Sequence, residues 1–173
     1  MSQNFMTMLP KNTILGIDPG IGRMGWAIIT QDKPKPLLVS YGCIETTPNS
    51  PQTARLMALS TQLTSVIKKY KPTVVAIEKL FFSKNVKTAL SVAEARGAII
   101  LSLKILGLDI LEFSPQQVKQ AATGQGNADK LMVQKMIKLT FGLKQAPKSD
   151  DAADALALAL CAYSRPKYLK NII

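Results

Sequence analysis

Apolar residues form short runs and helically spaced stretches along the chain, and this pattern predicts an α/β domain. Apolar runs bounded by Pro, Gly or polar turns predict five strands, at 13–18, 24–30, 37–45, 74–77 and 109–113. The run at 74–77 is continuously apolar, which is typical of a strand covered on both faces. The brief Pro-Gly connection after the first run predicts an antiparallel hairpin between the first two strands.

Apolar residues spaced by three and four positions predict helices after the third strand. We expect them at 53–70, 86–106, 115–122, 128–141 and 149–163. Three consecutive strands, followed by helices that connect to two further strands, indicate an α/β architecture with a mixed sheet. We therefore expect one domain over 13–163, with a leader at 1–12 and a basic tail at 164–173.

Carboxylates occur at the ends of three predicted elements. Asp18 ends the first strand, Glu78 follows the fourth, and Asp151 and Asp154 lie one turn apart at the start of the last helix. If the two strands are parallel neighbours, their carboxyl ends bring Asp18 and Glu78 together. Acids at a helix start can also simply complement the helix dipole. Asp150 competes with Asp151, because it too shares a helical face with Asp154.

Charge and composition suggest what these acids do. The chain has 22 Lys and Arg against 11 Asp and Glu, a net charge of +11, which favours encounter with nucleic acid. It contains no histidine, which excludes Ser-His and Cys-His catalysis and histidine metal ligands. Oxygen ligands then favour Mg²⁺, Mn²⁺ or Ca²⁺. Acids beside apolar elements in a basic protein are typical of metal-dependent nucleases.

The remaining composition bears on the compartment. The two cysteines, Cys43 and Cys161, stand in apolar contexts and are predicted to be buried, reduced thiols. No apolar run approaches the ~18 residues of a membrane span. Residues 1–10 lack the pattern of a secretion signal. We therefore expect a cytoplasmic protein.

A glycine pattern after the first strand resembles a dinucleotide-binding fingerprint. Gly20, Gly22 and Gly25 match G-x-G-x-x-G, but the residues that follow are β-prone, whereas the fingerprint requires a helix. We interpret these glycines as a tight turn that leaves room for a phosphate backbone.

Aromatic and basic residues follow Glu78 directly. Phe81 and Phe82 could stack on unpaired bases while Lys84 holds phosphate, although both rings could equally pack into the core. Lys119 and Lys130 precede the last helix, and their positions alone do not separate a site role from an ordinary solvated charge.

Five sequence blocks resemble the bacterial RuvC Holliday-junction resolvases over about residues 13–163. They are Gly16-Ile17-Asp18-Pro19-Gly20, Ala76-Ile77-Glu78-Lys79-Leu80-Phe81, Ala95-Arg96-Gly97, Gln117-Val118-Lys119-Gln120 and Asp151-Ala152-Ala153-Asp154-Ala155-Leu156-Ala157. The resemblance implies a ribonuclease-H-like fold with a five-stranded mixed sheet flanked by helices. It also implies a homodimer that resolves four-way DNA junctions by symmetric paired nicks in recombination and repair, leaving 5′-phosphate ends.

The family's functional residues can be carried onto this chain. Its catalytic, metal-binding acids fall on Asp18, Glu78, Asp151 and Asp154. Its DNA-contacting residues fall on Phe81, Lys119 and Lys130. The resemblance thereby favours Asp151 over Asp150 as the catalytic acid. Phe82 places a second aromatic ring next to Phe81, so either ring could be the one that enters the junction. The resemblance implies two Mg²⁺ per subunit, with Mn²⁺ as a substitute, and a RuvA/RuvB-type branch-migration partner in the bacterial cytoplasm. The long helix at 86–106 is the candidate dimer interface.

Three other functions are compatible with parts of this pattern. A nuclease for RNA–DNA hybrids would use the same acids on a different substrate. A non-catalytic binder of branched DNA would need no metal, and the intact set of acids argues against it. An actin-like phosphotransferase could use the Asp-x-Gly loop, but the chain is too short for the second lobe of such a nucleotide cleft.

Overall fold

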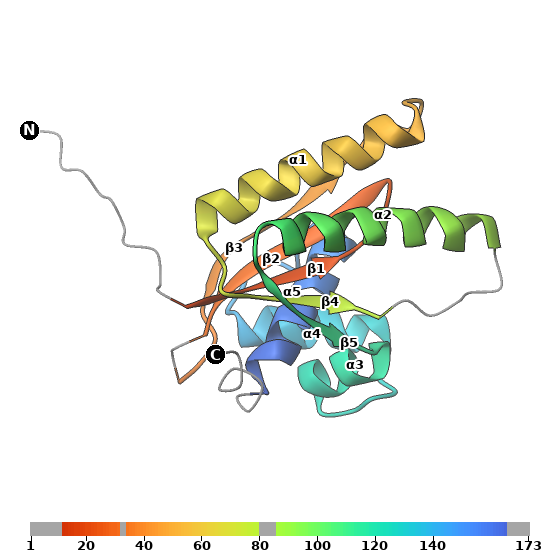
Figure 1. Cartoon of the computed structure of the whole chain (residues 1–173). Coiled ribbons are helices and arrows are strands. Elements are labelled where there is room, and N and C mark those ends of the chain that lie inside the picture. Colours follow the sequence, from red (N-terminus) through yellow and green to blue (C-terminus); the bar gives the residue numbers. More distant parts are fainter. Residues whose placement is uncertain (1–11, 32–33, 80–85, 166–173) are drawn as a thin grey trace, which may run out of the picture.

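The protein, described by a computed structural model over residues 12–31, 34–79 and 86–165, is built on a five-stranded mixed sheet (Figure 1). The strand order is β3-β2-β1-β4-β5. The first three strands are antiparallel, and β1, β4 and β5 are parallel to one another. Their bounds are Thr13–Asp18 (β1), Arg23–Thr30 (β2), Leu38–Glu45 (β3), Val74–Glu78 (β4) and Asp109–Phe113 (β5).

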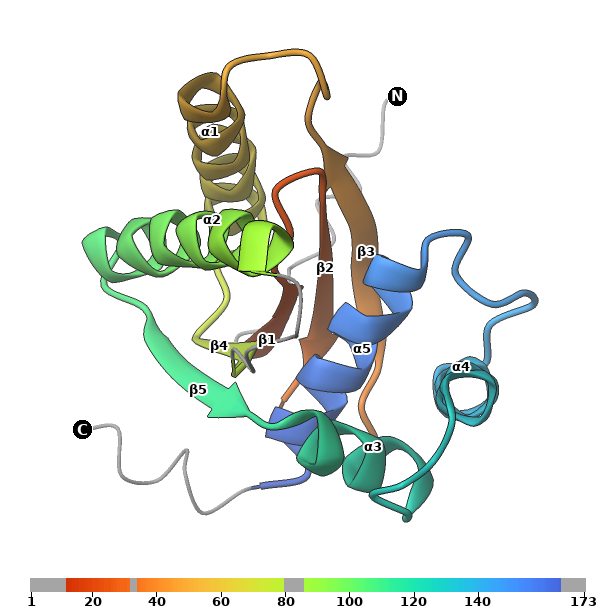
Figure 2. The same cartoon turned by 90° about the vertical axis from the view of Figure 1, so that its right-hand side faces the viewer.

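Helices cover both faces of this sheet. Figure 2 shows α1 and α2 on one side and α3, α4 and α5 on the other. Their bounds are Gln52–Tyr70 (α1), Val86–Ile105 (α2), Pro115–Thr123 (α3), Lys130–Thr140 (α4) and Asp150–Tyr163 (α5). None of these helices is long and apolar enough to cross a membrane, considering the described residues. The predicted mixed α/β sheet is confirmed.

Element ends follow local capping chemistry. Ser114 accepts a hydrogen bond from the Gln117 amide, and the Gln117 side chain accepts one from the Ser114 amide, so a capping box starts α3 as its sequence indicates. The helix predicted from residue 128 in fact begins at Lys130, because the Asp129 side chain accepts from the Met132 amide and caps it. The bounds predicted for β1 and β5 are confirmed, whereas β2, β3 and β4 each differ from the prediction by one residue at one end.

Alternation along the central strands divides the core in two. Leu15 and Ile17 on β1 pack with α1 and α2, whereas Ile14 packs with α5. All of β4 before Glu78 is buried, as its continuous apolar run predicts. Asp18 and Glu78 follow Ile17 and Ile77, and period-two alternation therefore turns both carboxylates towards the α5 side.

Two glycines allow α5 to lie unusually close to the sheet. A methyl group on Gly25 would stand 1.8 Å from the carbonyl oxygen of Asp151, and one on Gly16 would stand 2.0 Å from that of Ala155. The interpretation of the glycine pattern as one tight turn is therefore wrong for Gly25, which is a β2 residue under the acidic end of α5. It suits Gly20, where an added methyl would meet the turn's own backbone at Arg23.

The cysteines differ in exposure. Cys161 is buried on α5, and burial raises the pKa of its thiol to about 11. Cys43 is only partly buried, which corrects the prediction of two buried thiols. Both are free thiols, as predicted.

Candidate active site

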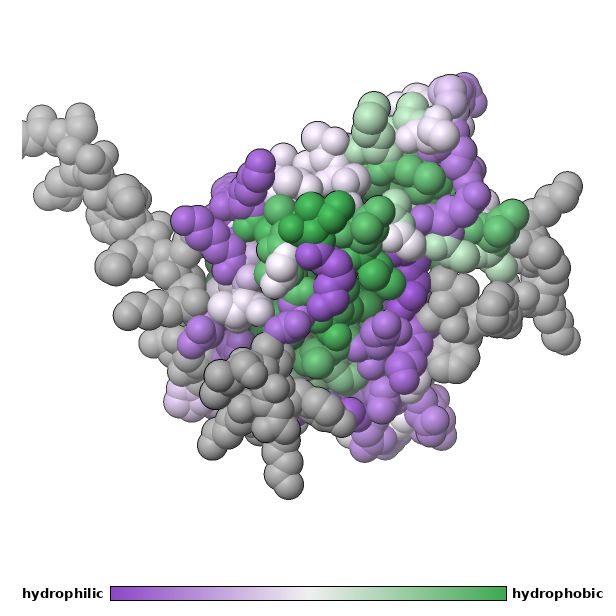
Figure 3. All heavy atoms as spheres, viewed as in Figure 1, coloured by the Kyte–Doolittle hydropathy of each residue, from purple (hydrophilic) through white to green (hydrophobic). Residues whose placement is uncertain are grey.

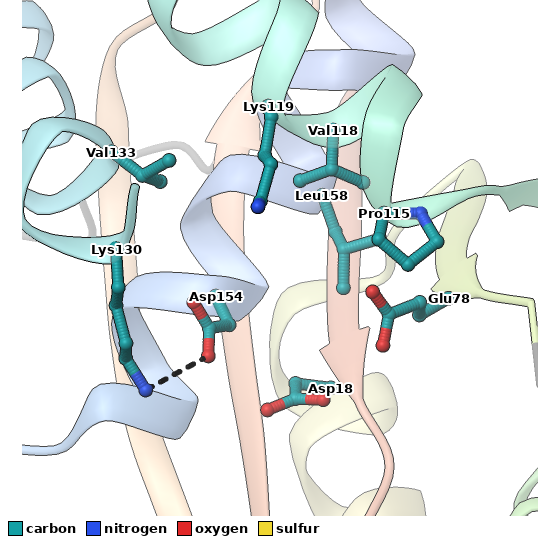
Figure 4. A pocket seen from close by; sticks show the side chains of 9 residues that line it. All are labelled: Asp18, Glu78, Pro115, Val118, Lys119, Lys130, Val133, Asp154 and Leu158. Atoms are coloured by element: carbon teal, nitrogen blue, oxygen red, sulfur yellow. Dashed lines mark ion pairs between the residues drawn. The ribbon is translucent and has the colours of Figure 1, made fainter. Parts of the chain in front are cut away.

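Two acids meet because β1 and β4 are parallel neighbours. The register pairs Ile17 with Ile77, and Asp18 and Glu78 are the next residues on each strand. Figure 4 shows their carboxylates side by side below α3. The crossover through α1 thus brings together two carboxylates that are far apart in the sequence.

Asp154 joins them from the first turns of α5. It lies in a cavity of about 230 Å³ that also receives Lys119 from α3 and Lys130 from α4 (Figure 4). The cavity's other lining residues are Pro115, Val118, Val133 and Leu158, together with Asp18 and Glu78. Three predicted acids and two predicted lysines therefore share one partly apolar cavity.

Asp151 occupies a different position from the other three acids. It does not line the cavity, and its Oδ2 accepts a hydrogen bond of 2.9 Å from the Ser149 hydroxyl. The Arg23 Nε atom lies 3.6 Å from the same oxygen, and Arg23 also pairs with Glu45 at 3.1 Å. Asp151 is nevertheless close enough to contribute to the electrostatics of Asp18.

The acids raise one another's pKa values. Burial, followed by the charges of Asp154, Glu78 and Asp151, raises the pKa of Asp18 to about 8. Burial and then Asp154 raise the pKa of Glu78, and burial is also the main cause of the raised pKa of Asp154. Such an arrangement of carboxylates has excess negative potential, which a bound cation would relieve.

Lys130 partly neutralises this potential. Its Nζ atom lies 3.1 Å from Oδ2 of Asp150 and 3.7 Å from Oδ2 of Asp154. Gln134, one turn further along α4, donates a 2.8 Å hydrogen bond to the other oxygen of Asp150. Asp150 thus lies outside the cavity in a network on its rim, whereas Asp154 faces inwards.

Arg96 is a positioning residue to which sequence reasoning assigned no role. Its Nε atom donates to the Glu78 carbonyl at 3.1 Å, and its Nη2 atom pairs with Glu112 at 2.7 Å. The side chain is only 14% exposed. It therefore ties the end of β4 to β5 from α2. The sequence signal for this role is an arginine inside the otherwise apolar stretch 95–101.

The donor set suits a hard divalent cation. The acidic side chains that line the cavity are those of Asp18, Glu78 and Asp154, and their carboxylate oxygens are the kind of ligand that fits Mg²⁺ or Mn²⁺. Within the described ranges no three acidic or thiol side chains converge closely enough to hold one ion as they lie. Two of the acids are engaged by basic groups, Asp151 by Arg23 and Asp154 by Lys130. The chemistry fits the metal, and coordination requires these side chains to rearrange.

The remaining predicted DNA-contacting residues, Phe81, Phe82 and Lys84, lie outside the described residues. The same is true of most of the predicted leader and tail.

Comparison with known proteins identifies relatives over almost the whole domain. The profile of the family described as "Crossover junction endodeoxyribonuclease RuvC" matches residues 14–162. The RuvC of Caldicellulosiruptor saccharolyticus is 51% identical over 149 residues, covering 86% of this chain and 90% of the relative. That of Chloroflexus aggregans is 46% identical over 153 residues, covering 88% and 93%.

Solved structures agree with these relatives. Thermus thermophilus RuvC in complex with Holliday junction substrate superposes with a TM-score of 0.83 at 33% identity, covering 88% of this chain and 94% of that one. The yeast mitochondrial Holliday junction resolvase Ydc2 has a TM-score of 0.68 at 17% identity, covering 96% and 84%, and shows the fold alone. The expected ribonuclease-H-like fold is confirmed.

Proposed function

Because the chain belongs to the family of the crossover junction endodeoxyribonuclease RuvC, we propose that it resolves four-way DNA junctions by hydrolysing phosphodiester bonds. The observation that carries this proposal is the cavity in which Asp18, Glu78 and Asp154 face Lys119 and Lys130. A cluster of acids able to hold cations, surrounded by a protein of net charge +11, matches a phosphodiester substrate.

The acids would hold the metal. Asp18, Glu78 and Asp154 already face the cavity, and Asp151 would join them after leaving Ser149 and Arg23. When bound, two Mg²⁺ ions supply an activated water nucleophile and stabilise the leaving 3′ oxygen, with Mn²⁺ as a substitute. Val118, Val133 and Leu158 form a partly apolar wall beside the acids, and the lower polarity on that side strengthens the electrostatic interactions inside the cavity.

The two lysines would act on the phosphate. Lys119 and Lys130 reach the cavity from different helices, Lys119 from α3 and Lys130 from α4 beside Asp154 (Figure 4). A cation held there offsets the negative charge that develops on the phosphate in the transition state. Phe81, Phe82 and Lys84 follow Glu78 directly in the sequence, where they could stack on open bases and hold the backbone at the junction centre.

A homodimer would supply two such sites. Leu90, Leu101 and Ile105 are exposed on α2 by 62%, 62% and 75%. Figure 3 shows apolar surface gathered over the C-terminal half of α2 and the neighbouring β5. Gly97 lies between these residues, and a methyl group there would meet nothing within 4 Å in the protomer, so a second helix could approach closely. Paired nicks in a nearly two-fold junction require two sites related by a two-fold axis.

Resolution of four-way DNA junctions belongs to recombination and repair, and we propose that the protein acts in these processes. We further propose a cytoplasmic location and a RuvA/RuvB-type branch-migration partner, supported by membership of the family.

A synthetic four-way junction tests the proposal. With Mg²⁺, the parent protein should introduce paired nicks at symmetric positions and leave 5′-phosphate ends, and chelation with EDTA should stop them. Asp18→Asn and Asp154→Asn should lose cleavage by orders of magnitude and still bind the junction, because affinity resides in the basic surface. Wild-type cleavage by either variant would refute the site. Preferential cleavage of an RNA–DNA hybrid would instead reassign the substrate.

A further inference from the structure

Asp150 lies next to the proposed site yet outside its cavity. It is the first residue of α5, directly before Asp151, and its side chain points to Lys130 rather than to Asp18 or Glu78. Its presence there is unexpected, since a further acid adds to the repulsion among carboxylates that are already close together.

The contacts of Asp150 form a short chain across the gap between α4 and α5. Gln134 donates to Oδ1 of Asp150 at 2.8 Å, and Oδ2 of Asp150 pairs with Lys130 at 3.1 Å. Each carboxylate oxygen thus has its own partner on α4. Because Lys130 and Gln134 are four residues apart on one helical face, both reach the same carboxylate.

Lys130 has two possible acidic partners, and it lies closer to Asp150. The 3.7 Å separation from Asp154 is an ion pair without a hydrogen bond, whereas the ammonium group lies at hydrogen-bonding distance from Asp150. If Asp150 lost its charge, Asp154 would be the nearest acid left for the lysine.

We propose, in an inference that rests on the function proposed above, that Asp150 is a positioning residue that holds Lys130 at the cavity rim. Lys130 is thereby kept at the longer ion-pair distance from Asp154 instead of closing onto it, so a divalent cation displaces the lysine from Asp154 more readily. The lysine also stays where it can meet the substrate phosphate. Asp150 therefore acts through Lys130 and touches neither the metal nor the DNA.

Metal binding without DNA tests this role directly. Titration of the full chain with Mn²⁺ by calorimetry gives a dissociation constant for the parent, Asp150→Asn, Lys130→Met and the double variant. In Asp150→Asn the freed lysine competes for Asp154, and the dissociation constant should rise roughly two- to fivefold, the range of exposed ion pairs. Asp150→Glu should restore most of the affinity. The matched control is Asp109→Asn, which removes an acid from a similarly exposed pair with Lys104 and should leave affinity unchanged.

The double variant separates positioning from simple charge. If Asp150 acts through Lys130, adding Asp150→Asn to Lys130→Met changes the Mn²⁺ dissociation constant no further. An equal rise in both backgrounds would mean that Asp150 acts through its own charge, and would overturn the proposal, as would unchanged affinity in Asp150→Asn. The Mg²⁺ concentration for half-maximal junction cleavage should rise by the same factor in Asp150→Asn. A parent protein that neither binds Mn²⁺ nor nicks the junction would overturn the proposed function itself, and this inference with it.

Discussion

The most informative perturbation is Asp18→Asn, because it should raise stability while it abolishes activity. In the metal-free protein, Asp18 is a half-buried carboxylate whose neighbours at Glu78 and Asp154 carry the same charge. Asparagine has nearly the same shape and no charge. Replacing the aspartate therefore removes the repulsion and much of the desolvation cost.

The magnitude follows from the raised pKa. The pKa rises from its ordinary value of 3.8 to about 8 in the folded protein, and at about 1.36 kcal/mol per pKa unit this difference corresponds to roughly 6 kcal/mol. Water entry and relaxation of the open cavity reduce this upper bound, so we expect ~2 kcal/mol. For a chain of 173 residues that is an increase in Tm of about 4–8 °C.

The difference in stability between Asp18→Asn and the parent depends on pH and on bound metal. The folded pKa of Asp18 is raised, so its contribution to stability is fully present below about pH 4 and is lost as pH rises towards about 8. In EDTA, the two proteins should thus unfold alike near pH 4, and the variant should be more stable at pH 8.5. Mg²⁺ should stabilise the parent more, because Asp18 is a proposed ligand.

Urea unfolding followed by circular dichroism at both pH values, with EDTA and with Mg²⁺, measures these differences. Asp109→Asn, an exposed acid on β5, is the charge control and should stay within about 0.5 kcal/mol of the parent. A variant equal to or less stable than the parent at pH 8.5 in EDTA would refute the view that uncompensated charge is stored at Asp18.

Other substitutions test how the site and the proposed dimer interface are built. Arg96→Gln should cost about 1–3 kcal/mol in urea unfolding and slow cleavage at saturating Mg²⁺, because the end of β4 loses a buried, charged donor. Gly25→Ala should cost more than about 3 kcal/mol and abolish cleavage, since its methyl overlaps the Asp151 backbone. Gly22→Ala, whose methyl would meet only the end of the Arg55 side chain at 3.4 Å, is the folded control in thermal melts. Leu101→Glu should yield a folded monomer by analytical ultracentrifugation, and a variant that remains dimeric would exclude α2 as the interface.

The elements and the chemistry of the site follow from local sequence. Apolar residues spaced by two positions, or by three and four, are enough to predict the strands and helices, because burial of one face of an element outweighs the weak secondary-structure propensities of single residues. Ser114 and Pro115 indicate the start of α3, since capping depends on neighbouring residues only. With no histidine and only two cysteines, far apart in the sequence, a metal site depends on oxygen ligands. The position of Asp18 and Glu78 at strand ends is visible in the same pattern.

Tertiary structure decided which of these groups meet. Only the placement of β4 beside β1 joins Asp18 to Glu78, and strand order is a long-range property that periodicity does not contain. Only the close seating of α5 on Gly16 and Gly25 turns Asp154 into the cavity.

The separation of Asp150 from Asp151 likewise depends on neighbours distant in sequence. Lys130 draws Asp150 towards α4, while Arg23 engages Asp151 from β2. Helical spacing allowed either acid to accompany Asp154, because both spacings of three and four share a face. The roles differ because a side chain's partners are set by packing between elements, which residue order along one helix does not specify.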